Sequence, residues 1–278
     1  MSGTPAREAL EGAITAIGAA GCETPRLDAE LLLADVLGVS REQLLTDRAL
    51  TVSGPAVRAF QSAVRRRAVE REPVAYIVGH RGFRNLELAA DARALVPRPE
   101  TELLVEAGLE LPAGTRVLDL CTGGGAVALA LKQERADLEL TGSDVSGEAL
   151  ELARENAARL GLDVAWIEAD LLEGVPDRFD AVLANPPYVA DREAGLLAPE
   201  IIRHEPRGAL FAGPDGLAVI RRLLAQLTPR TSVRTVALEL GAGQAPAVRE
   251  LMVSGGFVDC RCKKDLAGVE RVLIGERG

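Results

Sequence analysis

A four-residue segment, Asn185-Pro186-Pro187-Tyr188, combines an amide side chain, two prolines and an aromatic ring. It directly follows the apolar run 181–184, which has the length of a buried strand. Each proline restricts the residue before it to extended conformations, so we expect a stiff loop whose carbonyl oxygens are held in place. The side-chain oxygen of Asn185 and the backbone oxygen of Pro186 are then two acceptors for the N–H groups of one planar amide or amine.

This arrangement suits methylation of nitrogen. An amide nitrogen is a poor nucleophile because its lone pair is delocalised. Two acceptors that hold its hydrogens aim the lone pair at a methyl donor and stabilise the developing positive charge, while Tyr188 stacks on the flat group. A sulfonium cofactor carries an activated methyl group, so no metal or histidine base is required, and His80 and His204 are expected to be structural or peripheral. A rigid turn with no chemical role is the alternative for this segment.

A glycine-rich turn follows an earlier apolar run, 117–120, and precedes a helical segment. Glycines let the backbone approach a ligand, and the next helix presents unpaired N–H groups to it. No Gly-Lys-Ser/Thr follows, which excludes a nucleotide triphosphate loop. A tight turn without a ligand is the alternative. The residues of the turn are Cys121, Thr122, Gly123, Gly124 and Gly125.

Two acidic positions follow the next two expected strands. Asp144 lies about 20 residues after the glycines, where a carboxylate can accept hydrogen bonds from ribose hydroxyls. Asp170 and Leu171 occupy the corresponding place after the third strand, where an adenine ring can lie and Asp170 can accept from its amino group. The same glycines and Asp144 would equally suit a nicotinamide cofactor, and Asp144 is also a candidate helix N-cap.

Composition limits the class of protein. The chain has 278 residues, 47% of them hydrophobic and 26% charged, which fits a globular protein of one or two domains. A formal net charge of -9 disfavours broad binding to nucleic acid, since such binding depends on cationic groups. The run Arg65-Arg66-Arg67 is a candidate basic patch, although a solvated helix face is the favoured interpretation.

Neither secretion nor membrane attachment is indicated. No segment approaches the ~18 uninterrupted apolar residues that a bilayer span needs, and residues 1–8 carry no apolar run behind a basic flank. The cysteines lack the paired spacing of a zinc site and the density of a disulfide scaffold. We therefore expect free thiols, no bound metal, no membrane partner and a cytoplasmic location. The four cysteines are Cys22, Cys121, Cys260 and Cys262.

The first 75 residues are expected to form helices. Residues 27–38 carry apolar side chains at helical spacing and end at Gly38, and residues 55–71 fit a second helix with arginines on its polar face. Between Tyr76 and Pro97 the pattern shortens around several glycines, which indicates a hairpin or linker. The predicted organisation is a helical substrate-docking domain (1–75), a linker or hairpin (76–97) and a larger domain (98–278).

From Arg116 onward, short apolar runs alternate with helical segments, which is typical of a parallel βαβ sheet. The last two runs are too close for a helical crossover, so they should pair antiparallel. The predicted class is therefore α/β, with a Rossmann-like, mostly parallel sheet that ends in a C-terminal antiparallel hairpin, preceded by a small helical domain. The expected strands are 117–120, 138–144, 164–167, 181–184, 235–240, 257–260 and 271–274.

The chain closely resembles the bacterial release factor glutamine methyltransferases, which are class I S-adenosylmethionine-dependent enzymes. The likeness covers nearly the full length, and its N-terminal and linker segments discriminate best because Asn-Pro-Pro-Tyr also occurs in methyltransferases that act on adenine or guanine. The matching segments are residues 25–33, 72–79, 96–102, 185–188, 205–207, 215–217 and 265–268.

The resemblance implies methyl transfer from S-adenosylmethionine, with S-adenosylhomocysteine as product, to the N5 nitrogen of the glutamine in the Gly-Gly-Gln motif of peptide chain release factors. It implies cofactor contact by the Cys121–Gly125 turn, Asp144, Leu171 and Asn185. The substrate would be held by Asn185–Tyr188, with Asn185, Pro186 and Tyr188 as catalytic residues. The segment Pro97–Glu102 resembles the family's lid over the cofactor, and a helix start with Pro99 in its first turn is the alternative.

One residue departs from the family. Cys121 stands where the family usually has glycine, so its backbone either keeps a negative φ or tolerates strain. We interpret its thiol as a small buried side chain rather than a nucleophile.

Two other functions compete with this assignment. A nucleic-acid base methyltransferase needs the same geometry for an exocyclic amine, but the acidic balance disfavours it. A non-catalytic adapter that binds the cofactor would have no need of two acceptors aimed at an amine.

Overall fold

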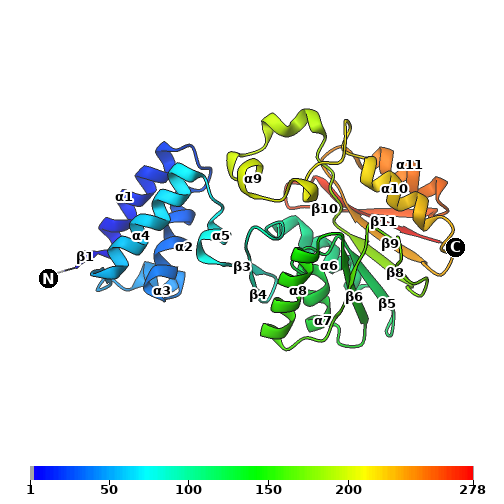
Figure 1. Cartoon of the computed structure of the whole chain (residues 1–278), viewed down its shortest axis with the longest axis horizontal. Coiled ribbons are helices and arrows are strands. Elements are labelled where there is room, and N and C mark those ends of the chain that lie inside the picture. Colours follow the sequence, from blue (N-terminus) through cyan, green and yellow to red (C-terminus); the bar gives the residue numbers. More distant parts are fainter. Residues whose placement is uncertain (1–2, 278) are drawn as a thin grey trace. The chain divides into compact units, whose positions relative to one another are not determined.

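The computed structural model describes residues 3–277, so Met1 and Ser2, part of the segment inspected for a leader, lie outside it. The chain forms two compact units, which Figure 1 shows in sequence colours. The smaller unit runs to His80 and also takes in Ala198–His204 from much later in the chain. The larger unit comprises Arg81–Leu197 and the chain from Glu205 onward. The return of 198–204 to the smaller unit was not expected from the sequence.

The smaller unit is a bundle of short helices around one apolar core that includes Ile17, Leu32, Leu33 and Phe60. Its second helix begins with Pro25 in the first turn and ends at Gly38, whose left-handed backbone closes the last turn. The elements are β1 (Thr4–Pro5), α1 (Ala6–Ala19), α2 (Pro25–Leu37), α3 (Arg41–Thr46), β2 (Thr51–Val52), α4 (Pro55–Arg65), the π-helix η1 (Arg66–Glu70), α5 (Val74–Val78) and α9 (Pro199–His204).

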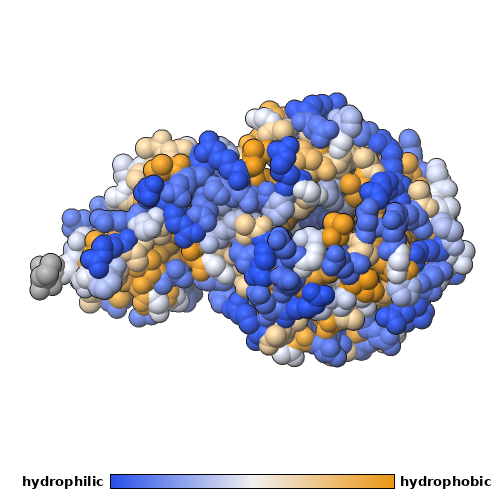
Figure 2. Space-filling view, in the orientation of Figure 1, coloured by the Kyte–Doolittle hydropathy of each residue, from blue (hydrophilic) through white to orange (hydrophobic). Residues whose placement is uncertain are grey.

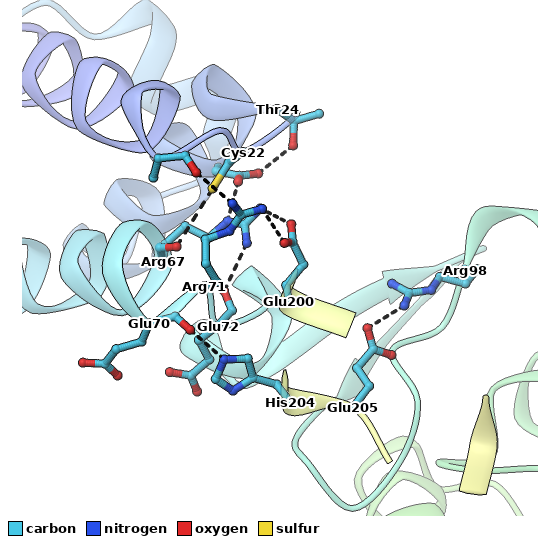
Figure 3. Close-up of polar contacts among 12 residues, drawn as sticks. Cys22, Thr24, Arg67, Glu70, Arg71, Glu72, Arg98, Glu200, His204 and Glu205 are labelled. Carbon is cyan, nitrogen blue, oxygen red and sulfur yellow. Dashed lines mark hydrogen bonds and ion pairs between the residues drawn. The ribbon is translucent and has the colours of Figure 1, made fainter. Parts of the chain in front are cut away.

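A buried ionic cluster occupies the place where a solvated helix face was expected (Figure 3). Arg67 is only 5% exposed, and its guanidinium donates to Asp28 at 2.6 Å and to Glu200 at 2.8 Å. Arg71 donates to the second oxygen of Glu200 at 2.6 Å. The expectation of a solvated face was therefore wrong for Arg67, because a π-helical turn carries it inward. Arg66 is paired with Glu72 at 2.6 Å, so the run does not form a free basic patch either.

The larger unit is built on a seven-stranded sheet in the order β10-β11-β9-β8-β5-β6-β7. Strands β5 to β9 are parallel to one another, whereas β11 runs antiparallel to both β9 and β10. This confirms the predicted sheet and its terminal hairpin. The strands are β5 (Arg116–Leu120), β6 (Glu139–Asp144), β7 (Ala165–Glu168), β8 (Ala181–Ala184), β9 (Thr235–Glu239), β10 (Asp259–Lys264) and β11 (Glu270–Glu276).

Alternate residues of the central strands enter two separate cores, so the unit has three layers. On one face Val117 and Leu183 pack with α6, α7 and α8, and on the other Leu118 and Val182 pack with α10 and α11, as Figure 1 shows. The helices are α6 (Glu102–Leu109), α7 (Ala126–Glu134), α8 (Gly147–Leu160), α10 (Ala218–Leu227) and α11 (Ala245–Ser254). Short elements complete the unit: β3 (His80–Phe83), β4 (Leu86–Ala89), η2 (Pro99–Thr101), η3 (Asp191–Leu196) and η4 (Arg207–Ala209).

The edge strand β10 differs from its expected position. Residues 257–260 were predicted as the strand, but pairing begins at Asp259 and extends to Lys264. Phe257 is fully buried in the core instead, and the paired residues are mostly charged. An edge strand exposes one side to water, so its sequence lacks the apolar run that marks a central strand.

Within residues 3–277, none of the helices is long and hydrophobic enough to cross a bilayer. Figure 2 shows hydrophilic residues over much of the visible face, with hydrophobic ones scattered between them.

Candidate active site

A cavity of about 350 Å³ lies in the larger unit at the ends of strands β5, β6 and β8. These strands are parallel, so the loops that leave their carboxyl ends meet at one edge of the sheet. The volume falls in the range typical of sites for small organic ligands. Most residues predicted for the cofactor line this cavity: Cys121, Thr122, Gly123, Gly124, Asp144, Asp170, Leu171 and Asn185.

Hydrogen bonds to Asp119, the penultimate residue of β5, hold the glycine-rich turn in place. Its Oδ2 accepts from the Thr122 hydroxyl and, at 3.1 Å, from the backbone N–H of Ala128 in the first turn of α7. Burial raises the pKa of Asp119 to about 7. The sequence interpretation missed Asp119, although an acidic residue inside an apolar strand is a recognisable signal of a buried hydrogen-bonding role.

Cys121 adopts a positive φ of 59°, the left-handed region that glycine occupies without cost. Of the two possibilities considered for this position, the backbone therefore takes the strained one. Burial raises the pKa of the Cys121 thiol well above its ordinary value, so the side chain is a neutral thiol. A neutral thiol agrees with the prediction that Cys121 is not a nucleophile, but the residue is only partly buried, because it lines the cavity.

Gly125 has a different role from the two glycines before it. It does not line the cavity; it begins α7 with a φ of 87°. A Cβ atom there would lie 2.9 Å from the ring of Trp166. Gly125 therefore permits close packing of the turn against the sheet, whereas Gly123 and Gly124 face the ligand cavity.

Asp144 ends β6 on the cavity wall, and its carboxylate accepts from the backbone N–H groups of Gly123 and Ser146, both at 2.9 Å. The N-cap of α8 is Ser146, whose hydroxyl accepts from Ala149, so Asp144 does not serve as the cap. Each carboxylate oxygen has a further lone pair that can accept a ribose hydroxyl. Burial raises the pKa of Asp144, and the backbone donors oppose that effect.

Asp170 and Leu171 lie at the next position along the cavity. Asp170 is half exposed, and one of its oxygens already accepts from Arg222 at 2.7 Å. Leu171 is buried with a φ of 55°, so its side chain forms an apolar part of the wall. The apolar surface suits a flat ring, and Arg222 competes for the carboxylate of Asp170.

The Asn185 side chain is oriented by Thr101. Its Nδ2 donates to the Thr101 hydroxyl at 3.2 Å, which directs the amide nitrogen toward η2. Between residues 3 and 277, no donor occupies the Asn185 side-chain oxygen or the Pro186 carbonyl oxygen. Neither acceptor predicted for the substrate nitrogen is therefore taken by another described group; Asn185 lines the cavity, whereas Pro186 is a buried residue of the same loop. Thr101 is buried, and the sequence interpretation did not assign it a role.

Tyr188 is anchored beneath the loop rather than lining the cavity. Its hydroxyl donates to Oε1 of Glu239 over a long 3.3 Å, and its carbonyl oxygen accepts from Gln244 at 2.9 Å. Glu239, at the end of β9, is 1% exposed, and its Oε2 has no hydrogen-bond partner among the described residues. Burial raises the pKa of Glu239 to about 7. Pro186 is buried and likewise does not line the cavity, whereas Pro187 does.

The segment Pro97–Glu102 forms one wall of the cavity through Pro97, Arg98 and Thr101, and it continues directly into α6. Glu205 fixes the start of this wall. Its carboxylate is buried and accepts from the Val96 N–H at 3.2 Å. It also accepts from the Arg98 guanidinium (Figure 3). The segment Glu205–Arg207 is therefore tied to the wall.

Neither histidine lines the cavity. His204 hydrogen-bonds to the Glu70 carbonyl oxygen at 2.8 Å, and the His80 ring lies 3.6 Å from the Asp35 carboxylate. All four cysteines are free. Within the described part of the chain, no cluster of three or more His, Cys, Asp or Glu side chains is placed to hold a metal ion.

The fold and the cavity define a class I methyltransferase, and known proteins agree. Residues 8–79 match the family described as PrmC N-terminal domain, and residues 99–241 match the methyltransferase small domain. A methyltransferase structure from Pyrococcus furiosus shares the fold, with a TM-score of 0.53 and 20% identity over 70% of this chain and 90% of that one.

Two relatives identify the family more narrowly. The release factor glutamine methyltransferase of Rhodospirillum rubrum is 41% identical over 263 residues, which cover 93% of this chain and 81% of that protein. That of Deinococcus radiodurans is 40% identical over 279 residues, 98% of both chains. The chain belongs to the release factor glutamine methyltransferase family, which confirms the resemblance found in the sequence.

Proposed function

We propose that the protein transfers a methyl group from S-adenosylmethionine to the side-chain amide nitrogen of a glutamine in a peptide chain release factor. The observation that carries the proposal is the pair of available acceptors, the Asn185 side-chain oxygen and the Pro186 carbonyl oxygen, beside a cavity lined by the glycine-rich turn. The protein substrate acts in translation termination, which places the activity in the cytoplasm.

The cavity fits the cofactor in size and in chemistry. Asp144 would hold the ribose hydroxyls, Leu171 would contact the adenine, and the Cys121–Gly124 turn would follow the rest of the molecule. When bound there, the cofactor supplies a methyl group activated by a positively charged sulfur. The carboxylate of Asp144 on the wall also favours a cation, whereas that of Asp170 is already paired with Arg222.

The chain's own contribution is orientation and charge stabilisation. Thr101 holds the nitrogen of Asn185, so its oxygen faces the substrate amide together with the Pro186 carbonyl. These two acceptors bind the N–H groups more strongly as positive charge develops on nitrogen, so they stabilise the transition state more than the ground state. As the bond between the nitrogen and the methyl carbon forms, the bond between that carbon and sulfur would break, the sulfur would leave as a neutral thioether, and the methylated nitrogen would lose one proton to water.

Labelled S-adenosylmethionine tests the function directly. The protein is incubated with an intact release factor and, separately, with tRNA, rRNA and DNA. We expect label on the release factor, at the glutamine by mass spectrometry of its peptides. Label in nucleic acid alone would instead establish a base methyltransferase.

A binding measurement tests the cofactor. A ligand that binds only the folded state raises the melting temperature. We expect S-adenosylmethionine to do so and NAD to have no effect. Stabilisation by NAD alone would contradict the assignment.

A further inference from the structure

The most exposed large hydrophobic side chains among the described residues are Leu266, which is fully exposed, and Leu196, at 83%. Leu266 lies in the tight turn between β10 and β11, and Leu196 ends η3, eight residues after Tyr188. The pairing of β10 with β11 places the turn that carries Leu266 at one end of these two strands. A leucine that is left fully in water adds no buried apolar area to the fold, so the Leu266 side chain is available for a contact with another molecule.

The turn that carries Leu266 is rigidly built around Asp265. One carboxylate oxygen accepts from the N–H groups of Ala267 and Val269, both at 2.9 Å, and the other accepts from the Arg271 guanidinium at 2.8 Å. The Asp265 N–H donates to the Val269 carbonyl oxygen, also at 2.9 Å. Leu266 is thus presented on a preformed turn, and binding would cost little conformational entropy.

The sheet places this turn at the same edge as the Asn185–Tyr188 loop. Strand β11 is antiparallel to β9 and pairs Val272 with Glu239, so its first residues lie at the carboxyl end of β9. Strand β8 is the next neighbour, and the loop follows its carboxyl end. Two strand spacings separate β11 from β8, which is roughly 10 Å.

A folded protein that inserts a loop at this edge covers the surface around the loop. A typical specific interface buries about 800 Å² on each partner, which corresponds to a disc of roughly 16 Å radius. Leu266 falls inside such a footprint. Val258, 65% exposed, precedes the other end of β10; six strand residues separate the two ends, or about 20 Å, so Val258 falls outside it.

We propose that the Asp265–Val269 turn is a docking element for the protein substrate, with Leu266 packing against an apolar surface beside the methylated loop. The proposal rests on the proposed function, because it takes a folded release factor as the occupant. The substrate glutamine and the cofactor do not need this contact, so its role is recognition of the whole protein.

Kinetics with two substrates test the proposal. Leu266→Ser should raise KM for an intact release factor about 10-fold or more, as expected from the loss of one buried leucine contact. Its kcat, its affinity for S-adenosylmethionine and its activity on a short Gly-Gly-Gln peptide should equal those of the wild type. The matched control, Val258→Ser, removes a similarly exposed side chain at the opposite end of the hairpin and should change none of these quantities.

A crosslinking measurement adds independent evidence. A photoreactive benzoylphenylalanine at position 266 should crosslink to the intact release factor, and the same group at position 258 should not. An unchanged KM for Leu266→Ser together with no crosslink at 266 would overturn the docking role. Failure of the wild-type protein to methylate any release factor would instead overturn the proposed function.

Discussion

At the scale of single residues, Asn185 has the most direct chemical role in the mechanism that we propose. Asn185→Ala removes one of the two acceptors, so turnover should fall on the order of 10²–10³-fold, by analogy with single donors in oxyanion holes. The affinity for S-adenosylmethionine should change little, because the acceptor acts mainly as charge develops on the substrate. Single-turnover methylation and isothermal titration with the cofactor measure the two quantities.

Thr101→Val provides the companion variant for Asn185. It keeps the shape of Thr101 but removes the hydroxyl that accepts from the Asn185 nitrogen, so it should lower turnover less than Asn185→Ala does. Near-normal turnover in Asn185→Ala would remove the loop from the mechanism.

For Cys121, in contrast, we predict that a substitution stabilises the protein. Its φ of 59° costs a residue with a Cβ roughly 1 kcal/mol, and glycine adopts it freely. Cys121→Gly should therefore leave methyl transfer intact and raise the free energy of unfolding by at most about 1 kcal/mol, since glycine also makes the unfolded chain more flexible. Chemical denaturation measures the change. Loss of activity in a folded Cys121→Gly protein would assign the thiol a role.

Glu239 predicts a pH dependence of stability. Burial raises its folded-state pKa to about 7, above the ordinary value of 4.5, so the folded protein binds this proton more tightly than the unfolded chain does. The resulting stabilisation is fully present below pH 4.5 and is lost as pH rises through about 7, with a size on the order of 3 kcal/mol.

Melting temperatures of wild type and Glu239→Gln from pH 4.5 to 8 measure the contribution of Glu239. The Glu239→Gln variant should lack the part of the fall in melting temperature with rising pH that comes from Glu239. The part that comes from Asp119 remains in the variant, because the pKa of Asp119 is also raised to about 7. Glu151→Gln, on an exposed position of α8, is the control and should follow the wild type. Parallel curves for wild type and Glu239→Gln would show that Glu239 is ionised throughout.

At the scale of elements, the sequence predicted the central strands well because each is a short apolar run buried on both faces. The glycine-rich turn and Asp144 were recognisable from their spacing. Thr101 and Glu239 were not, since their importance comes from the hydrogen-bonded neighbours that folding brings to them. Glu200 is the clearest case: its arginine partners lie 129 and 133 residues away in sequence, and a six-residue helix carries no local sign of them.

The buried ionic cluster of the smaller unit supplies the prediction at this scale. Arg67→Met leaves the buried Asp28 without its cation and Glu200 with Arg71 alone, which should lower the free energy of unfolding by about 3–5 kcal/mol. Arg65→Met, at a position 72% exposed, is the matched control and should cost less than about 1 kcal/mol. Urea denaturation followed by circular dichroism compares them, and equal losses would mean that the cluster does not stabilise the unit.

At the scale of the whole molecule, we propose that the two units have different functions. The described residues that line the cavity all belong to the larger unit, as do Thr101, Asn185 and Glu239. The smaller unit contributes none of them, and it matches a separate family, the PrmC N-terminal domain. Cofactor binding and the acceptor pair therefore depend on the larger unit, which leaves recognition of the intact substrate as the function we propose for residues 1–75.

Removal of residues 1–75 tests that division. The truncated protein should bind S-adenosylmethionine within a few-fold of the full chain and should methylate a short Gly-Gly-Gln peptide at a similar, low rate. Methylation of the intact release factor should fall at least about 10-fold, because docking contacts distant from the reacting glutamine are lost. The peptide is a poor substrate for both proteins, since it must lose conformational entropy that a preformed loop has already lost.

The truncation also removes Arg67 and Arg71, the partners of Glu200. Circular dichroism and the cofactor-induced rise in melting temperature must therefore first show that the remaining chain is folded. Glu200→Gln in the truncated chain then serves as the control: without the arginines its carboxylate has no ion pair to lose, so the substitution should leave both rates unchanged. Equal rates of the truncated and full-length proteins on the intact release factor would rule out docking by the helical unit and place all recognition on the larger unit, around the Asn185–Tyr188 loop and the Asp265–Val269 turn.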